Sequence, residues 1–137
     1  MKDEDKRVHL QLIQGMVSRL AGNSFLIKGW SVTLISALFA LAAANTNPLF
    51  VYLAYFPSFA FWSLDAYFLR QERLFRKLYD HVTRLDSSEI DYSMDTSAFE
   101  SAVQSQFRTG ISPTLRLFHG TATATIIVVM LVLIVAK

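Results

Sequence analysis

Long apolar stretches alternate with mixed and polar ones along the chain. Two uncharged runs, 29–44 and 49–64, flank a polar turn, and a third run, 117–136, has His119 as its only ionisable side chain. A helix needs about 20 apolar residues to cross the ~30 Å hydrocarbon core of a bilayer. The turn Asn45-Thr46-Asn47-Pro48 favours a tight connection between two helices. The pattern therefore predicts an all-α integral membrane protein with transmembrane helices at 25–44, 48–69 and 113–136.

Helical periodicity extends from the first span back towards the N-terminus. Within residues 1–24, a helical pattern recurs at spacings of three and four, at His9, Leu12, Ile13, Met16, Val17 and Leu20. This segment is interpreted as a cytoplasmic amphipathic helix. No proline separates it from the first span, so one continuous helix over about 4–44 is expected. Gly22-Asn23-Ser24 is the place where such a helix would break or bend.

The second arm also continues past its span. Spacings of four and three, typical of a coiled coil, mark a cytoplasmic seam formed by Phe68, Gln71, Phe75, Leu78, Val82 and Leu85. A helix over 48–85 is expected, kinked by Pro57 because proline removes one backbone hydrogen bond. At 1.5 Å per residue, each arm measures roughly 60 Å. The two arms predict a long antiparallel hairpin, half of which projects into the cytoplasm.

The segment 70–112 is predicted to hold a cytoplasmic helical extension, a loop and a short helix. Ser97 and Glu100 match the capping box, in which both side chains satisfy free amides at a helix start. An amphipathic helix over 97–108 is therefore expected, ended by Gly110. Ser112-Pro113 suits the start of the third transmembrane helix. Residues 1–137 are interpreted as a single membrane domain.

Composition narrows the classes of protein. The chain has 137 residues, 53% of them hydrophobic, and no cysteine. Without cysteine there is no disulfide framework, thiolate metal site or cysteine nucleophile. The net charge of +2 is too small to indicate a nucleic-acid partner. The bilayer itself is the first expected partner.

The placement of the basic residues predicts the topology. All but one of the 13 Lys and Arg residues precede the first apolar run (29–44) or lie between the second (49–64) and the third (117–136); the exception is Lys137. No signal peptide is expected, because the first apolar run follows the mixed-charge stretch 2–7. By the positive-inside rule, the N-terminus is cytoplasmic and the C-terminus lies on the outer face. The expected location is the inner, or cell, membrane of a bacterium.

The hairpin places residues at matching depths on its two arms. Counting outward from the turn puts Lys28 opposite Asp65 and Trp30 beside Trp62. An intramembrane ion pair would offset the cost of two charges near lipid. The alternative is that Lys28 and Asp65 each reach the interface separately. The two tryptophans would form an aromatic belt at the interface.

Several surfaces indicate self-association, and a homo-oligomer is therefore expected. Small residues let membrane helices approach closely, and they are found at Gly15, Gly22, Gly29, Ser36 and Ala43 on the first arm and at Gly120 and Ala124 on the third span. His119, Thr121, Thr123 and Thr125 are candidate pore-lining residues, although threonines two apart cover more than one helix face. The cytoplasmic seam would pair with another copy, or with the N-terminal helix of the same chain. In the second case the oligomer would rest mainly on the third span.

The residues do not indicate an enzyme. No nucleophile motif, glycine-rich phosphate loop or H-E-x-x-H spacing is present. His9 and His81 lie at similar heights near Asp5 and Asp80, but two histidines on helix faces are far more often solvated than metal-bound. No catalytic, metal or cofactor site is predicted.

Two segments resemble small bacterial multi-pass membrane proteins: Arg19-Leu20-Ala21-Gly22-Asn23-Ser24-Phe25 with Lys28-Gly29-Trp30, and Phe61-Trp62-Ser63-Leu64-Asp65-Ala66-Tyr67 with Glu72-Arg73. The layout of residues 5–85 also resembles SLATT-type effectors, which are two-span hairpins with a cytoplasmic helical extension. That resemblance implies a defence effector of nucleotide-signalled conflict systems that perforates the inner membrane. The third span departs from it, and a nucleotide sensor would have to be a separate partner.

Two functions are therefore expected from different classes. The first is a homo-oligomeric pore-forming or membrane-disrupting effector, a channel gated through its cytoplasmic helices. The second is a membrane anchor or adaptor that scaffolds a cytoplasmic protein partner.

Overall fold

The fold consists of helices and connecting segments. A computed structural model describes residues 2–45 and 47–136, and no strand occurs among them. Three helices are long and apolar enough to cross a membrane, as the sequence predicts. In chain order the elements are α1 (Lys2–Asn45), α2 (Leu49–Leu53), α3 (Tyr55–Arg84), the 3₁₀-helix η1 (Ser97–Ala102), α4 (Gln106–Gly110) and α5 (Pro113–Val135). Thr46, at the centre of the expected turn, lies outside the described residues.

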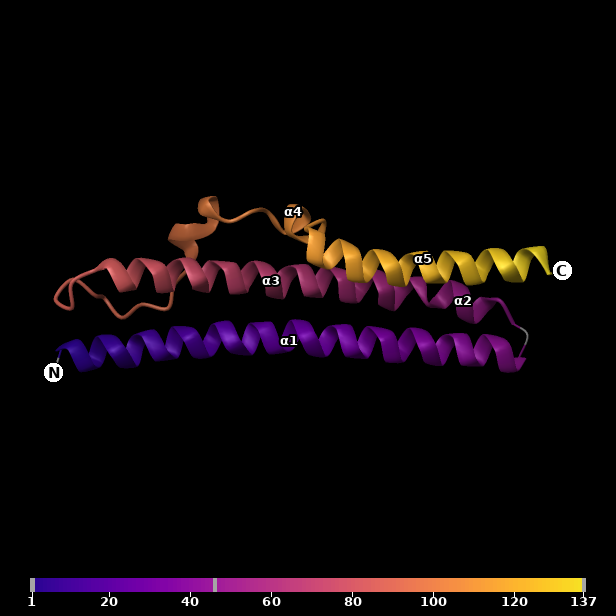
Figure 1. Cartoon of the computed structure of the whole chain (residues 1–137), viewed down its shortest axis with the longest axis horizontal. Helices are drawn as coiled ribbons and strands as arrows, with labels where there is room; N and C mark the ends of the chain where they lie inside the picture. Colours follow the sequence, from indigo (N-terminus) through magenta and orange to yellow (C-terminus); the bar gives the residue numbers. More distant parts are fainter. Residues whose placement is uncertain (1, 46, 137) are drawn as a thin grey trace.

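The first helix is unbroken. α1 passes through Gly22-Asn23-Ser24 without interruption and runs antiparallel alongside α3 (Figure 1). Its first turn carries Asp3, Glu4 and Asp5, which face the positive end of the helix dipole. One stripe of α1 is buried, at positions three, four or seven residues apart: His9, Ile13, Val17, Leu20, Ser24, Ser31, Ile35 and Ala42.

The second arm is interrupted at one residue within the expected range 48–85, and Leu49–Arg84 still forms one candidate membrane span. The helical pattern is interrupted at Ala54, between α2 and α3. Pro57 has no N–H to donate to the carbonyl of Leu53, and its ring crowds that carbonyl, so the break falls one turn before the proline. Ala54 instead closes a tighter turn by donating its N–H to the Val51 carbonyl at 3.2 Å. α3 ends at Arg84, close to the predicted end.

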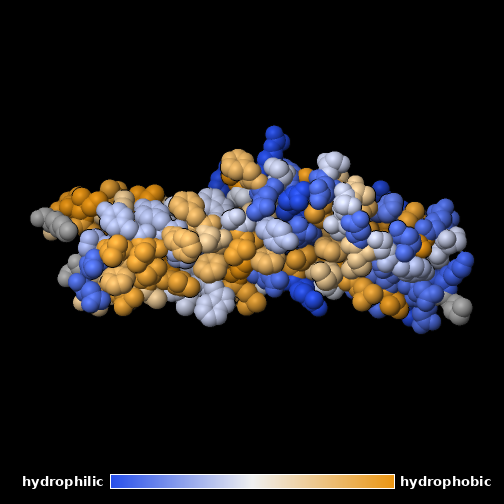
Figure 2. Space-filling model, turned by 180° about the vertical axis from the view of Figure 1, so that it is seen from behind, coloured by the Kyte–Doolittle hydropathy of each residue, from blue (hydrophilic) through white to orange (hydrophobic). Residues whose placement is uncertain are grey.

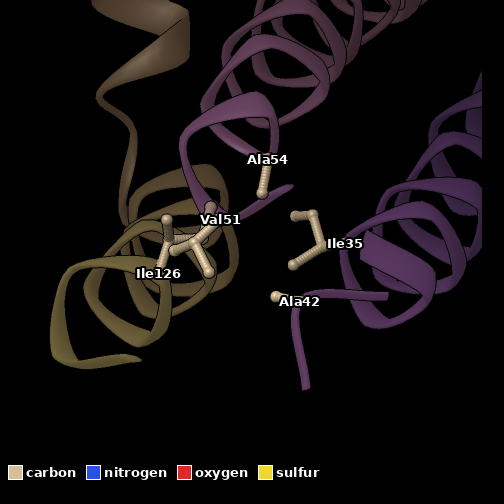
Figure 3. Close-up of a cluster of buried hydrophobic side chains, with 5 residues drawn as sticks. All are labelled: Ile35, Ala42, Val51, Ala54 and Ile126. Carbon is tan, nitrogen blue, oxygen red and sulfur yellow. The ribbon is translucent and has the colours of Figure 1, made fainter. Parts of the chain in front are cut away.

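Two separate apolar clusters hold the helices together. One lies near the turn and joins three helices through Ile35, Ala42, Val51, Ala54 and Ile126 (Figure 3). The other lies at the opposite end, where Ile13 of α1 packs with Leu78 and Val82 of α3 and with Ile90 from the following loop. Phe75 and Leu85 pack against this second cluster. The cytoplasmic seam is thus occupied from within the chain, by the N-terminal helix that was one of its two expected partners.

The expected helix over 97–108 is wrong. The segment forms η1, an extended stretch at Val103 (φ −117°, ψ 142°) and the separate helix α4. The capping box does not form: Thr96 is the N-cap of η1 and makes no side-chain cap, and the Ser97 hydroxyl donates to Asp95. Arg70 and Arg73 of α3 bind the carbonyl and the side chain of Gln104, which fixes the extended stretch. Ser105 then caps α4.

The third long helix covers one side of the pair. α5 packs on α3 and α2 through Leu115, His119 and Ile126, and its other face is open. Ser112 is its N-cap and Pro113 its first residue, as expected, but the Ser112 hydroxyl makes no capping bond. Hydrophobic residues gather over the half of the molecule that holds the C-terminal end of α5, and hydrophilic residues over the other half (Figure 2).

Candidate functional site

A carboxylate without any solvent exposure lies where α1, α3 and α5 meet. Asp65 of α3 is 0% exposed. Lys28 of α1 places its Nζ 2.6 Å from Oδ2, and His119 of α5 places its Nε2 2.7 Å from the same oxygen. The Ser24 hydroxyl donates to Oδ1. We call these four residues the Asp65 cluster.

The continuity of α1 positions two members of the cluster. Ser24 and Lys28 are four residues apart and therefore share one face of the helix. Lys28 Nζ also donates to Ser24 Oγ at 2.8 Å, so the two side chains brace each other. If α1 were broken at Gly22-Asn23-Ser24, Ser24 and Lys28 would not both reach the Asp65 carboxylate.

Trp62 of α3 fixes His119. The indole and imidazole rings stack with centroids 5.6 Å apart and an angle of 11° between their planes. The indole Nε1–H donates to the Gly110 carbonyl at 2.8 Å, which holds the ring in place. A Cβ on Gly110 would lie 3.5 Å from Ala66 Cβ, an ordinary van der Waals distance, so α4 packs on α3 here without requiring a glycine. Its φ is not positive, so Gly110 does not adopt the left-handed conformation of a helix end.

The cluster holds opposite charges away from solvent. Lys28 and Asp65 neutralise each other, and Lys28 lies 5.9 Å from the centre of the Phe118 ring. His119 is 0% exposed, and its Nδ1 has no hydrogen-bond partner among the described residues. With its hydrogen on Nε2, the imidazole donates to the Asp65 carboxylate, so one buried side chain on α3 binds both α1 and α5.

The structure brings together some of the residues singled out in the sequence and separates others. Lys28 and Asp65 meet. Trp30 is 61% exposed, whereas Trp62 stacks on His119, so the two tryptophans have different surroundings. The Ser24 and His119 bonds to Asp65 were not predicted. Their one signal is that His119 is the only ionisable residue of the third apolar run, where a charge needs a partner.

The small-residue stripe of α1 faces away from α3. Each of its members is exposed: Gly15, Gly22, Gly29, Ser36 and Ala43. A Cβ built on any of its three glycines meets nothing within 4 Å, so the stripe contacts no other part of the described chain. Gly120 on α5 is likewise open, and Ala124 is exposed.

The candidate pore-lining residues of α5 point in two directions. His119 and Thr123 face α3, where the Thr123 hydroxyl lies 3.2 Å from that of Ser58. Thr121 and Thr125 are exposed, and their hydroxyls donate to carbonyls of their own helix. A single copy therefore does not contain a threonine-lined channel.

The remaining histidines pack on aromatic rings. His9 meets Tyr92 edge-on at 5.5 Å, and His81 lies 5.5 Å from Phe99. No group of three metal-ligating side chains occurs in residues 2–45 and 47–136.

No family model, curated protein or solved structure matches the chain. The chemistry of the Asp65 cluster is thus the strongest guide to function.

Proposed function

We propose that the chain is a non-enzymatic, three-span protein of a bacterial inner membrane, with a cytoplasmic N-terminus, that self-associates into a gated pore. The observation that carries this proposal is the Asp65 cluster. Ionisable side chains within a bilayer are costly and typically mark ion or proton pathways. Here three such side chains, Lys28, Asp65 and His119, come from three different candidate spans.

In the closed state of the pore, the Asp65 cluster holds α5 against α1 and α3. It ties α5 to the pair formed by α1 and α3 by two bonds to one carboxylate, from Lys28 and from His119. Displacement of α1 against α3 weakens this tie. Because α1 and α3 are continuous from the Ile13 and Leu78 contact to the cluster, a movement of their cytoplasmic ends is transmitted to it.

The open face of α5 is where copies meet. Gly120, Thr121, Ala124 and Thr125 lie on the side that no other element covers. Small residues permit close helix contact in lipid, and threonines hydrogen-bond across it. The layout shared with SLATT-type effectors supports the same reading of an oligomer that perforates a membrane.

The test is ion flux in liposomes with a K⁺ gradient and a potential-sensitive dye. Asp65→Asn removes the carboxylate that holds the helices together, so this variant is expected to dissipate the membrane potential faster than the wild type. Adding Gly120→Leu should abolish the leak by blocking contact between copies. Val132→Leu, at a 60% exposed position of α5, is the matched control and should leave the leak intact. If liposomes that contain the Asp65→Asn variant keep their membrane potential, the pore proposal is wrong.

An adaptor is the second candidate. Val8 and Leu12, one turn apart near the N-terminus of α1, are 48% and 59% exposed. This is the part of α1 expected to lie in the cytoplasm, where exposed apolar pairs favour a protein partner. A cross-linked oligomer that leaves the potential intact with Asp65→Asn would favour this function.

A further inference from the structure

A groove of about 500 Å³ runs between α3 and α4. Phe59, Trp62 and Ala66 line it from α3, and Phe107 and Ile111 line it from α4 and the residue that follows. We call it the α3/α4 groove. Its volume is in the range of small-molecule sites, and its walls are mainly apolar. Phe59, Phe107 and Ile111 are 56%, 78% and 48% exposed, so nothing in the described chain covers it.

Two arginines continue the same face of α3 beyond the groove. Arg70 and Arg73 follow Ala66 by four and seven residues, so they share its side of the helix. Arg70 Nε donates to the Gln104 carbonyl at 3.2 Å, and Arg73 Nη1 to the Gln104 side chain at 3.4 Å. Neither forms an ion pair with a carboxylate of the described residues. Each guanidinium has five N–H donors, so most of their donors remain for a ligand.

The length of this face matches one leaflet of a bilayer. From Phe59 to Arg70 the helix rises about 16 Å at 1.5 Å per residue. Half of a hydrocarbon core is about 15 Å. An acyl chain lying along the groove would therefore reach the bilayer centre, while its phosphate would lie at the level of the arginines.

We propose that the α3/α4 groove binds one anionic phospholipid, with an acyl chain against Phe59 and Trp62 and the phosphate on Arg70 and Arg73. Arginine suits this role because its planar fork binds phosphate oxygens in pairs. The charge of the mouth and the apolar length of the groove together match this ligand better than a second helix. The proposal rests on the membrane placement proposed above, and it does not require a pore.

Brominated lipids test the groove directly, because bromine quenches a nearby indole. The chain has two tryptophans, so Trp30→Phe leaves Trp62 as the only reporter. This variant is reconstituted in vesicles that contain brominated phosphatidylglycerol or brominated phosphatidylcholine with the same acyl chains. The relative affinity, obtained from quenching against mole fraction, is expected to favour phosphatidylglycerol by about tenfold, since each interfacial basic residue adds several-fold.

Charge-matched variants distinguish lipid binding by Arg70 and Arg73 from attraction by the overall charge of the protein. Arg70→Gln with Arg73→Gln should bring the two lipids to equal affinity. Lys77→Gln with Arg84→Gln removes the same charge from exposed positions of α3 and should retain the preference. Ser63→Phe, which fills the groove, should lower quenching by both lipids. Thermal unfolding in detergent checks that each variant is folded.

Three outcomes would overturn the proposal. Equal affinities for the two lipids in the Trp30→Phe protein would remove the anionic specificity. Equal losses in both double variants would assign the preference to overall charge. Protection of Trp62 from both lipids would mean that protein, such as a second copy, fills the groove. None of these outcomes depends on ion flux, so the lipid-binding proposal can fail without the pore proposal failing, and the reverse.

Discussion

The two halves of the α1 and α3 pair are held by different chemistry. Near the N-terminus of α1, the buried contact is aliphatic, with Ile13 against Leu78 and Val82. Beyond Leu20 the same two helices bury a carboxylate and several small or polar side chains, including Ser24, Ser31 and Ser58. One pair of helices thus changes its mode of packing along its length.

The proposed membrane placement explains the change. In water, burial of aliphatic area drives association, at about 25 cal/mol per Å². Within a bilayer that driving force is absent, because lipid tails are as apolar as leucine, and helices associate through close packing and polar bonds. The carboxylate of Asp65 and the serines lie in the part of the pair expected in the membrane, where the other apolar cluster, near the turn, also forms. The cluster around Ile13 lies in the part expected in the cytoplasm.

Removal of the Asp65 charge is expected to have the largest effect on stability. Asp65→Asn leaves Lys28 and His119 beside a weaker acceptor in a buried site. Breaking one partner of a buried ion pair typically costs about 3–5 kcal/mol. The free energy of unfolding, measured by titration with a denaturing detergent in mixed micelles, should fall by about this amount.

A double-mutant cycle isolates the Lys28 bond. Once Asp65→Asn has been made, Lys28→Gln should add little further loss, because the two changes remove the same interaction. If Asp65→Asn cost no stability, or if the two losses were additive, the ion pair would not hold the membrane half together. The claim that polar bonds hold the half that contains Asp65 would then be wrong.

Ile13→Ala tests the aliphatic half. Ile13 is 0% exposed and lies at the centre of the second apolar cluster. The lost burial and the remaining cavity should cost about 3 kcal/mol of unfolding free energy. Leu12→Ala, at a neighbouring position that is 59% exposed, should change it by at most ~0.5 kcal/mol. Similar losses for the two variants would mean that α1 does not present the observed face to α3.

The helices and the pairing of Lys28 with Asp65 could be predicted because both follow from local rules. Backbone hydrogen bonds close within each helix, so apolar periodicity alone marks α1, α3 and α5. The rise per residue is fixed, so counting from the turn places Lys28 opposite Asp65. The contact of Ile13 with Leu78 follows from the same counting.

The remaining contacts depend on rotations and tertiary bonds that counting does not determine. A long irregular segment precedes α5, so the sequence does not specify which face of α5 meets Asp65, and the His119 bond was missed. The expected helix over 97–108 had a capping signal, but Arg70 and Arg73 bind Gln104 and override it. Trp62 stacks on His119 rather than pairing with Trp30, which is exposed.

A smaller effect is expected from the bond between Ser58 and Thr123. Their hydroxyl oxygens lie 3.2 Å apart and join α3 to α5 in the half expected in the membrane. Such hydrogen bonds between membrane helices contribute about 0.6 kcal/mol on average. Ser58→Ala should lower the free energy of unfolding by about this amount, and Thr123→Ala should add nothing to it. Additive losses would show that packing, rather than the hydroxyl bond, joins the two helices at this point.

Asp95, in the loop beside the aliphatic half, should show the smallest effect, and only in acid. The backbone N–H and then the hydroxyl of Ser97 donate to its carboxylate, and these bonds hold the pKa of Asp95 below its ordinary value of 3.8. A pKa lowered by folding means that the bonds stabilise the loop above pH 3.8, and that this stabilisation is lost as the pH falls through the folded pKa.

An NMR titration of the Asp95 carboxyl in detergent measures this pKa. Ser97→Ala keeps the backbone donor and removes the hydroxyl, so the pKa of Asp95 should rise part of the way towards the ordinary value. Ser101→Ala, at an exposed position nearby, is the control and should not move it. An unchanged pKa in Ser97→Ala would mean that the hydroxyl does not bind the carboxylate in solution. Unlike the Asp65 cluster, this exposed turn would then contribute to the cytoplasmic half through its backbone alone.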